Sequence, residues 1–146
     1  MVSYTITIRG GATHTPIQHI EGTQDIHCRH AVLTSVVVQL DNTNNTMHGF
    51  SVKFPSAVCP PSATHNAGPD NEASTQNRVA VHFSQDTGTF FYKPNLIMHD
   101  MTFLSSFEVQ LYDIMNTDTL VTQAQLNHIH CITLHFSCAV DSLIMA

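Results

Sequence analysis

Apolar and polar residues alternate along most of this chain, and this period of two constrains its fold more than any other feature. Residues 2–9 show it first, with apolar side chains at the even positions and polar ones at the odd positions. The pattern recurs at residues 50–54, 79–83, 107–111 and 132–136. Because successive side chains of a strand leave opposite faces of a sheet, each segment is predicted to form a strand with one buried face. No stretch shows the period of a helix, so the chain is predicted to be all-β.

The segments predicted to form strands cover most of the chain: residues 2–9, 15–20, 25–32, 33–40, 47–54, 78–84, 88–93, 105–113 and 128–138. One parity persists from Ile26 to Leu40, which is long for a single strand. That stretch is predicted to be either one long bent strand or two strands that share a bulge. Turn-forming residues at 41–46 and 85–88 predict hairpin connections.

Residues 55–77 form the longest stretch without a strand pattern, and their prolines exclude a central strand or a helix. A loop of this length in a compact domain is usually functional or disordered. We expect it to contact a neighbouring subunit, through Pro60, Pro61, His65, Asn66, Pro69 and Asn71. A second irregular stretch is predicted at residues 94–102.

The length of 146 residues fits one domain, and no linker or internal repeat divides residues 1–146. Alternating strands joined by long crossing loops predict an antiparallel two-sheet sandwich, in which each sheet buries one face against the other. A single jelly roll is the first choice of topology, and another Greek-key sandwich is the second.

Charged residues make up only 11% of the chain, against about 25% in typical soluble domains. Such a surface suits a protein partly hidden in an assembly, because interface cores are depleted in charge, and it also suits a neutral sandwich of the secreted type. Five Lys and Arg residues face eleven Asp and Glu residues. Direct nucleic-acid binding is therefore not expected, because it needs a basic footprint. No leader or long apolar run is visible, so neither a signal peptide nor membrane insertion is expected.

Four cysteines, Cys28, Cys59, Cys131 and Cys138, show no spacing typical of a disulfide framework. We interpret them as free thiols, because three of them lie in predicted strands, where a buried thiol acts as a small hydrophobe. An even number of cysteines nevertheless leaves disulfides open.

Histidine is unusually frequent, with 11 residues, and two clusters combine it with cysteine. His128 and His130 would share a face of a strand and are the candidate metal ligands. No Cys-x-x-Cys turn accompanies them, and no Glu follows as the cupin pattern requires. We therefore interpret the histidines as polar strand or interface residues and expect neither a metal nor a cofactor. A second hypothesis is that they act as a pH switch at a subunit interface.

Catalytic motifs are absent from the sequence. It contains no Gly-x-Ser-x-Gly elbow and no glycine-rich phosphate loop ending in Lys. The aspartates at 113 and 118 flank a predicted turn, where Asp is ordinary turn chemistry. We expect a protein that is not an enzyme, and no catalytic residue is named.

The last third of the chain combines residues 107–113 (Phe-Glu-Val-Gln-Leu-Tyr-Asp), a polar turn at 116–118, residues 120–121 and a closing strand at 130–138. This part of the chain resembles the C-terminal part of small viral jelly-roll structural proteins, such as minor capsid, vertex (penton) and spike-head proteins of DNA viruses. The resemblance implies a structural role in a virion, with self-association into a trimer or pentamer and contact with other capsid proteins. The alternative is a stand-alone binding module, lectin-like or cytokine-like, that recognises a glycan or a receptor.

Overall fold

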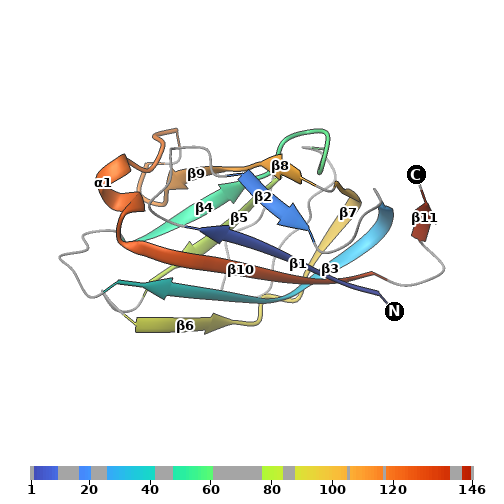
Figure 1. The fold of residues 1–146 in the computed structure, drawn as a ribbon, viewed down its shortest axis with the longest axis horizontal. Coiled ribbons are helices and arrows are strands. Elements are labelled where there is room, and N and C mark those ends of the chain that lie inside the picture. Colours follow the sequence, from blue (N-terminus) through green and yellow to red (C-terminus); the bar gives the residue numbers. More distant parts are fainter. Residues whose placement is uncertain are drawn as a thin grey trace.

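Two antiparallel sheets packed face to face form the part of the chain that the structure describes (Figure 1). The predicted all-β sandwich is therefore confirmed. The computed structural model describes residues 2–9, 17–20, 26–41, 48–60, 77–83, 88–104, 106–116, 118–138 and 143–145.

The strands follow the alternating segments of the sequence. In chain order they are β1 (Val2–Arg9), β2 (Ile17–Ile20), β3 (Ile26–Leu40), β4 (Gly49–Lys53), β5 (Arg78–His82), β6 (Gly88–Tyr92), β7 (Leu96–Phe103), β8 (Ser106–Glu108), β9 (Gln110–Asp113), β10 (Ile129–Cys138) and β11 (Leu143–Met145). A short helix, α1 (Gln123–Leu126), precedes β10.

The larger sheet is built around β3, its longest strand. Strand β10 pairs along one side of β3, and β1 pairs with β10 over its whole length. On the other side of β3, β7 pairs with the first half and β6 with the second half. Strand β11 also pairs with the beginning of β3. Because β3 has partners on both sides, its inward side chains lie in the middle of the core.

The smaller sheet has the order β5-β4-β9 and forms the second layer of the sandwich (Figure 1). Strand β8 lies just before β9 in the chain but pairs with β2 instead of β4. Strand β2 in turn pairs with β1 of the larger sheet. The predicted single strand 105–113 is therefore wrong, because the chain changes partners at Val109, which is fully buried.

Aromatic rings fill the space between the two sheets. Phe136 on β10 lies with its ring centroid 5.3 Å from that of Phe103 on β7 and 6.3 Å from that of Phe54, which follows β4. The ring of Tyr4 on β1 stacks on Phe103 at 4.4 Å. These contacts join three strands of the larger sheet to the end of β4, and large buried rings contribute much of the stability of a core.

The prediction that no segment is helical is wrong for residues 123–126. The side chain of Thr122 accepts a hydrogen bond from the backbone N–H of Gln125 (3.1 Å), and Gln125 Oε1 accepts one from the backbone N–H of Thr122 (2.9 Å). This capping box stabilises the first turn of a helix. A helix of one turn is too short to show a period of 3.6 residues, so the pattern did not reveal it.

The prediction of an irregular stretch at residues 94–102 is also wrong, because β7 occupies Leu96–Phe103. Its buried side chains are Leu96, Met98, Met101 and Phe103, so the alternation loses phase between Met98 and Met101. Asp100 has a φ of 55° in the middle of the strand. This left-handed residue interrupts the period of two and hid the strand from the sequence pattern.

Strand β3 resolves the two alternatives predicted for residues 25–40: it is one strand that contains a bulge. Its pairing with β10 shifts register between Ser35 and Leu33, which leaves Thr34 as the extra residue. The hydroxyl of Thr34 donates to the backbone oxygen of His135 (3.1 Å). The expected constant parity is wrong, because Ala31 and Leu33 are buried although they lie at odd positions.

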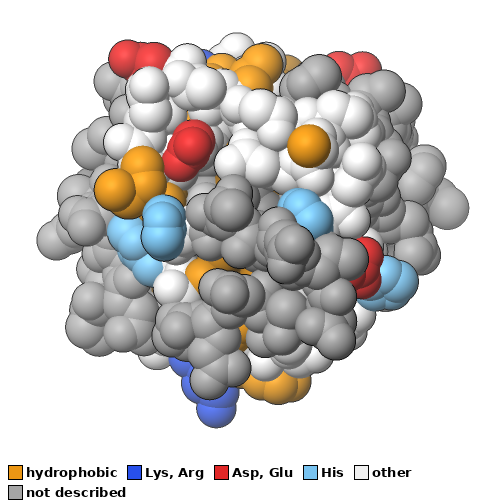
Figure 2. All heavy atoms as spheres, turned by 90° about the vertical axis from the view of Figure 1, so that its left-hand side faces the viewer, with side chains coloured by type: hydrophobic (Ala, Val, Ile, Leu, Met, Phe, Trp, Pro, Cys, Tyr) orange, Lys and Arg blue, Asp and Glu red, His pale blue; other side chains and the backbone are white. Residues whose placement is uncertain are grey.

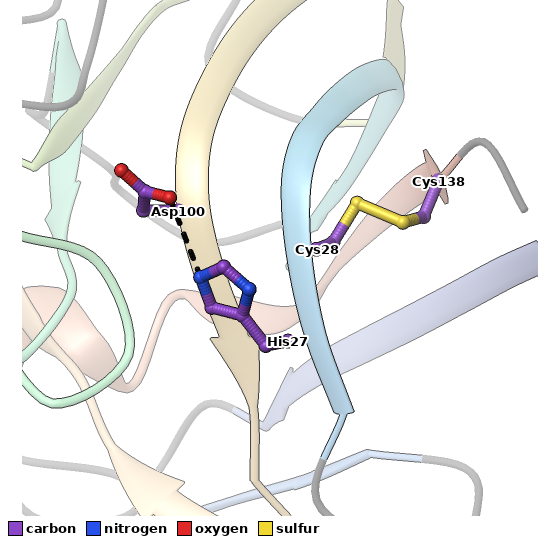
Figure 3. The surroundings of a disulfide bond; sticks show 4 residues. All are labelled: His27, Cys28, Asp100 and Cys138. Carbon is purple, nitrogen blue, oxygen red and sulfur yellow. Dashed lines mark ion pairs between the residues drawn. A yellow bond between two sulfur atoms is a disulfide. The ribbon is translucent and has the colours of Figure 1, made fainter. Parts of the chain in front are cut away.

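The interpretation of all four cysteines as free thiols is wrong for Cys28 and Cys138, which form a disulfide (Figure 3). The bond joins the beginning of β3 to the end of β10, across a sequence separation of 110 residues. Both side chains face the core and are fully buried. Pairing of these strands in space brings the sulfur atoms together, and no sequence spacing signals it. Cys59 and Cys131 remain thiols.

The prediction of hairpin connections at residues 41–46 and 85–88 is wrong, because each connection leads from one sheet to the other: β3 and β6 belong to the larger sheet, and β4 and β5 belong to the smaller one. Residues 42–47 and 84–87 of these connections, and residues 61–76 of the long loop, lie outside the described residues. At the beginning of that loop, the backbone N–H groups of Val58 and Cys59 donate to Pro55 O at 2.9 and 3.0 Å. Residues 55–60 thus form a turn, as their composition predicted.

Candidate interaction surface

Only one of the residues predicted to contact a neighbouring subunit falls within the described part of the chain. Pro60 is half-buried, and its carbonyl oxygen accepts a weak hydrogen bond from the thiol of Cys59 at 3.8 Å. The others, Pro61, His65, Asn66, Pro69 and Asn71, lie outside the described residues. Contact through this loop therefore stays a prediction.

His128 and His130, the candidate metal ligands, were expected to share a face of one strand. They do not. His128 lies in the turn after α1, where its backbone N–H donates to Gln125 O (3.0 Å), and His130 lies in the first part of β10. His130 is exposed, with Nδ1 4.0 Å from a carboxylate oxygen of Asp41. Among the described residues, no group of three or more His, Cys, Asp and Glu side chains is arranged to hold a metal ion.

Several histidines lie at the end of the sandwich where α1 lies. Figure 2 views that end and shows several histidine side chains with only a small area of Lys and Arg. His48 and His82, which flank the β4–β5 pairing, are exposed there with His130. The pH-switch hypothesis stays a prediction.

A surface without formally charged side chains occupies part of the outer side of the larger sheet. Strand pairing aligns its side chains in rows that cross four strands. One row runs from Thr7 through Thr133 and Val37 to Phe91, on β1, β10, β3 and β6. Each of these side chains points away from the core, because its neighbours along the strand are buried or packed on the core.

A second row lies about four residues further along the strands. It runs from Ser3 through Ser137 and Val32 to Ile97, on β1, β10, β3 and β7. Between the rows, His135 lies opposite Thr5 on one side and Ser35 on the other. Its Nδ1 lies 3.3 Å from Thr5 Oγ1. We call these eleven side chains the uncharged face: Ser3, Thr5, Thr7, Val32, Ser35, Val37, Phe91, Ile97, Thr133, His135 and Ser137.

The uncharged face combines small hydroxyl groups at its centre with exposed apolar groups at one side. Phe91 is 73% exposed and Ile97 is 45% exposed, and they are two of the three large hydrophobic side chains exposed among the described residues. The valines and threonines of the central strands are half-buried by their neighbours. Exposed apolar side chains beside uncharged polar ones are typical of surfaces that contact another molecule.

The uncharged face was not predicted from the sequence, although part of its pattern is visible there. The odd positions of residues 3–7 and 133–137 already alternate Ser, Thr and His with the core residues. The rows become visible only when the strands are placed side by side, because β1 and β10 come from opposite ends of the chain.

Among the described residues, no helix is long and apolar enough to cross a membrane. Comparison of the chain with models of protein families, with curated proteins and with solved structures finds no significant match.

Proposed function

We propose that this chain is a non-enzymatic structural protein that self-associates through the uncharged face, as a component of a virion. The observation that carries the proposal is the uncharged face itself, with Phe91 and Ile97 exposed at its side. A large apolar surface left in water is unfavourable, and exposed apolar patches commonly mark interaction sites.

The charge of the chain favours this face over other surfaces as the contact between copies. Each copy carries a formal net charge of −6 with histidine neutral. Two copies that approach each other through charged surfaces therefore repel each other. Contact through side chains without formal charge avoids both this repulsion and the desolvation of charged groups. Protein interfaces are depleted of charge at their centres for the same reason.

The order of strand pairing supports the jelly-roll topology. The first strand β1 lies beside the last long strand β10, and β10 lies beside β3. Between them the chain passes to the smaller sheet for β4 and β5, returns for β6 and β7, and passes back for β9. This alternation between sheets is typical of a jelly roll built from two Greek keys.

The resemblance of residues 107–138 to viral jelly-roll proteins then supports a trimer or pentamer that contacts other capsid proteins. The Cys28–Cys138 disulfide is compatible with this location, because virion surfaces are among the oxidising environments in which disulfides persist. The same proposal includes a location in the virion. It also includes contact with other capsid proteins through the 55–77 loop.

Light scattering on the purified full chain tests the proposal, with Phe91→Asp as the variant and Met115→Asp as the matched control. Both side chains are exposed hydrophobics, at 73% and 75%, but Met115 follows β9 and lies outside the uncharged face. We expect the unchanged chain and Met115→Asp to form the same closed oligomer, and Phe91→Asp to be monomeric. Circular dichroism should show that both variants keep the β-fold.

Two results would contradict this proposal. One is an oligomer of unchanged mass in Phe91→Asp. The other is a monomer of the unchanged chain at every concentration, which would instead favour a stand-alone binding module.

A further inference from the structure

Two histidines face each other on neighbouring strands of the larger sheet, at a place that the proposed self-association does not use. His30 on β3 pairs directly with His99 on β7. Their ring centroids are 4.7 Å apart, and the ring planes meet at 76°. Both side chains point away from the core, because the next pair along the strands, Ala31 and Met98, is fully buried. The two imidazoles therefore meet on the outer side of the sheet.

An irregularity shared by the two strands gathers further polar side chains around these rings. On β7, Met98 and Met101 are buried, so His99 and Asp100 between them both lie on the outer side. The φ of 55° at Asp100 allows this change of phase. Strand β3 shows the same step, with two consecutive exposed residues at 29–30. Each strand thus presents a charged side chain beside its histidine.

The backbone that carries the histidine pair is held firmly on both sides. The Cys28–Cys138 disulfide anchors β3 two residues before His30. Beyond the pair, Val32 continues the pairing with Ile97. Ligands on paired strands are placed more precisely than ligands on loops. His30 is exposed and its partner is half-buried, so an ion from solution can reach both rings.

The separation of the two rings fits two ligands of one metal ion. Zinc binds an imidazole nitrogen at about 2.0–2.1 Å, so two imidazoles on one tetrahedral zinc have ring centroids about 5 Å apart. The separation between His30 and His99 is 4.7 Å. Because His30 is exposed, its ring can turn about its side-chain bonds and direct a nitrogen at the ion. Coordination uses one nitrogen of each ring and leaves the other to keep a hydrogen bond.

The charges next to the histidine pair are of both signs. Asp100 follows His99, and its carboxylate lies 3.4 Å from Nε2 of His27 (Figure 3). Its negative charge attracts a cation, whereas the exposed Arg29 beside His30 repels one. Nitrogen coordination, rather than net charge, therefore selects the ion. Imidazole suits zinc, copper and nickel, whereas magnesium and calcium take oxygen ligands.

We propose that His30 and His99 together bind one divalent transition-metal ion, with Zn²⁺ as the ion of choice. The two imidazole nitrogens supply half of a tetrahedral shell, and water fills the other two positions. Two protein ligands make a site of modest affinity, and the described residues contain no group of three or more ligands. The proposal does not depend on self-association, because neither histidine belongs to the uncharged face.

Titration of the ¹⁵N-labelled full chain with zinc chloride near neutral pH, followed by nuclear magnetic resonance, tests this proposal. Magnesium chloride is the comparison, because Mg²⁺ has the same charge but binds oxygen ligands. We expect Zn²⁺ to shift the ring resonances and backbone amides of His30 and His99 along one common binding curve. Mg²⁺ should leave them in place. A common curve indicates that one ion binds both rings.

His30→Gln and His99→Gln separate binding by two ligands from binding by single histidines. Removal of either ligand should weaken Zn²⁺ binding at the remaining ring by about tenfold or more. His130→Gln is the matched control, because His130 is an exposed histidine of the same sheet, and its zinc affinity at His30 should equal that of the unchanged chain. A dispersed amide spectrum should show that each variant keeps the fold.

Three results would overturn the proposal. The first is that Zn²⁺ shifts neither His30 nor His99, and the second is that Mg²⁺ shifts them equally. The third is a zinc affinity in His30→Gln that equals the affinity in His130→Gln. Phe91→Asp should bind Zn²⁺ as the unchanged chain does, which separates this test from that of self-association.

Discussion

Tyr92 shows how one residue links the two layers of the sandwich. It lies on β6 of the larger sheet, and its phenol donates a hydrogen bond of 2.7 Å to the backbone oxygen of His82 at the end of β5 in the smaller sheet. Burial raises the pKa of Tyr92 to about 12 from its usual 10.0, because the phenolate would lose its hydration. Burial also raises the pKa of Tyr4.

These pKa shifts predict a loss of stability in alkaline solution. Above pH 10 the tyrosines of the unfolded chain lose protons while Tyr92 of the folded chain retains its own, so the unfolded state binds fewer protons and the free energy of unfolding falls with pH. The contribution of Tyr92 is fully present below about pH 10 and is lost as the pH approaches about 12. Urea unfolding measured between pH 9 and 12 checks this expectation.

Tyr92→Phe is the variant that isolates the effect. Its stability should fall less steeply with pH than that of the unchanged chain, with a remaining slope from Tyr4. An identical pH dependence in the two proteins would contradict the prediction. The sequence alone does not predict the raised pKa of Tyr92. A tyrosine in an alternating segment is recognisable, but its burial and its hydrogen-bond partner on the other sheet are not.

Strand β3 shows where sequence patterns succeed and fail at the scale of an element. Its existence and its two ends were predicted closely, because Val, Ile, Leu and Thr favour strands and turn-forming residues follow it. Its buried face was predicted only in part. The bulge at Thr34 shifts the alternation of buried side chains by one residue. It lies where the pairing of β3 with β10 changes register.

The pairing of β3 with β10 also predicts the effect of the Cys28–Cys138 disulfide on stability. By the chain-entropy model, a bond that closes a loop of this length restricts the unfolded chain enough to stabilise the fold by about 4–5 kcal/mol. Reduction with a strong thiol should lower the melting temperature of the unchanged chain by many degrees. Differential scanning calorimetry with and without the reductant measures it.

Cys28→Ser and Cys131→Ser form a matched pair for this experiment. Cys131 also lies on β10, but it is a half-buried thiol outside the disulfide. The melting temperature of Cys131→Ser should respond to the reductant as the unchanged chain does, and that of Cys28→Ser should not respond. Equal responses of the two variants would show that the bond does not form.

At the scale of the whole molecule, side chains without formal charge gather on one part of the outer side of the larger sheet, the uncharged face. Charged residues lie elsewhere on both sheets, such as Arg29 on β3 and Lys53 on β4. The sequence predicted a surface poor in charge from its 11% of charged residues. It did not predict that uncharged side chains would gather on one face, because residues adjacent on that face are up to about 130 positions apart in the chain.

The absence of formal charge on the uncharged face predicts how salt affects the proposed oligomer. Ion pairs would weaken as the Debye length falls from about 30 Å at 0.01 M to about 8 Å at 0.15 M salt. Contact through the uncharged face contains no such pairs, and salt screens the repulsion between copies of net charge −6. The oligomer should therefore persist or strengthen between these salt concentrations. Sedimentation velocity at both concentrations checks this, and dissociation at the higher one would contradict it.

The sequence by itself determined the fold class, most strand positions and the alternating core residues, such as Ile6, Val52 and Leu134. These properties follow from the period of two, which is local and survives in any arrangement of the strands. Tertiary structure alone decided the disulfide, the phase of β3, the partner change at Val109, the uncharged face and the pairing of His30 with His99. Each of these depends on which strands lie side by side and in which register. That choice is made by contacts between residues far apart in the chain, and no local pattern records it.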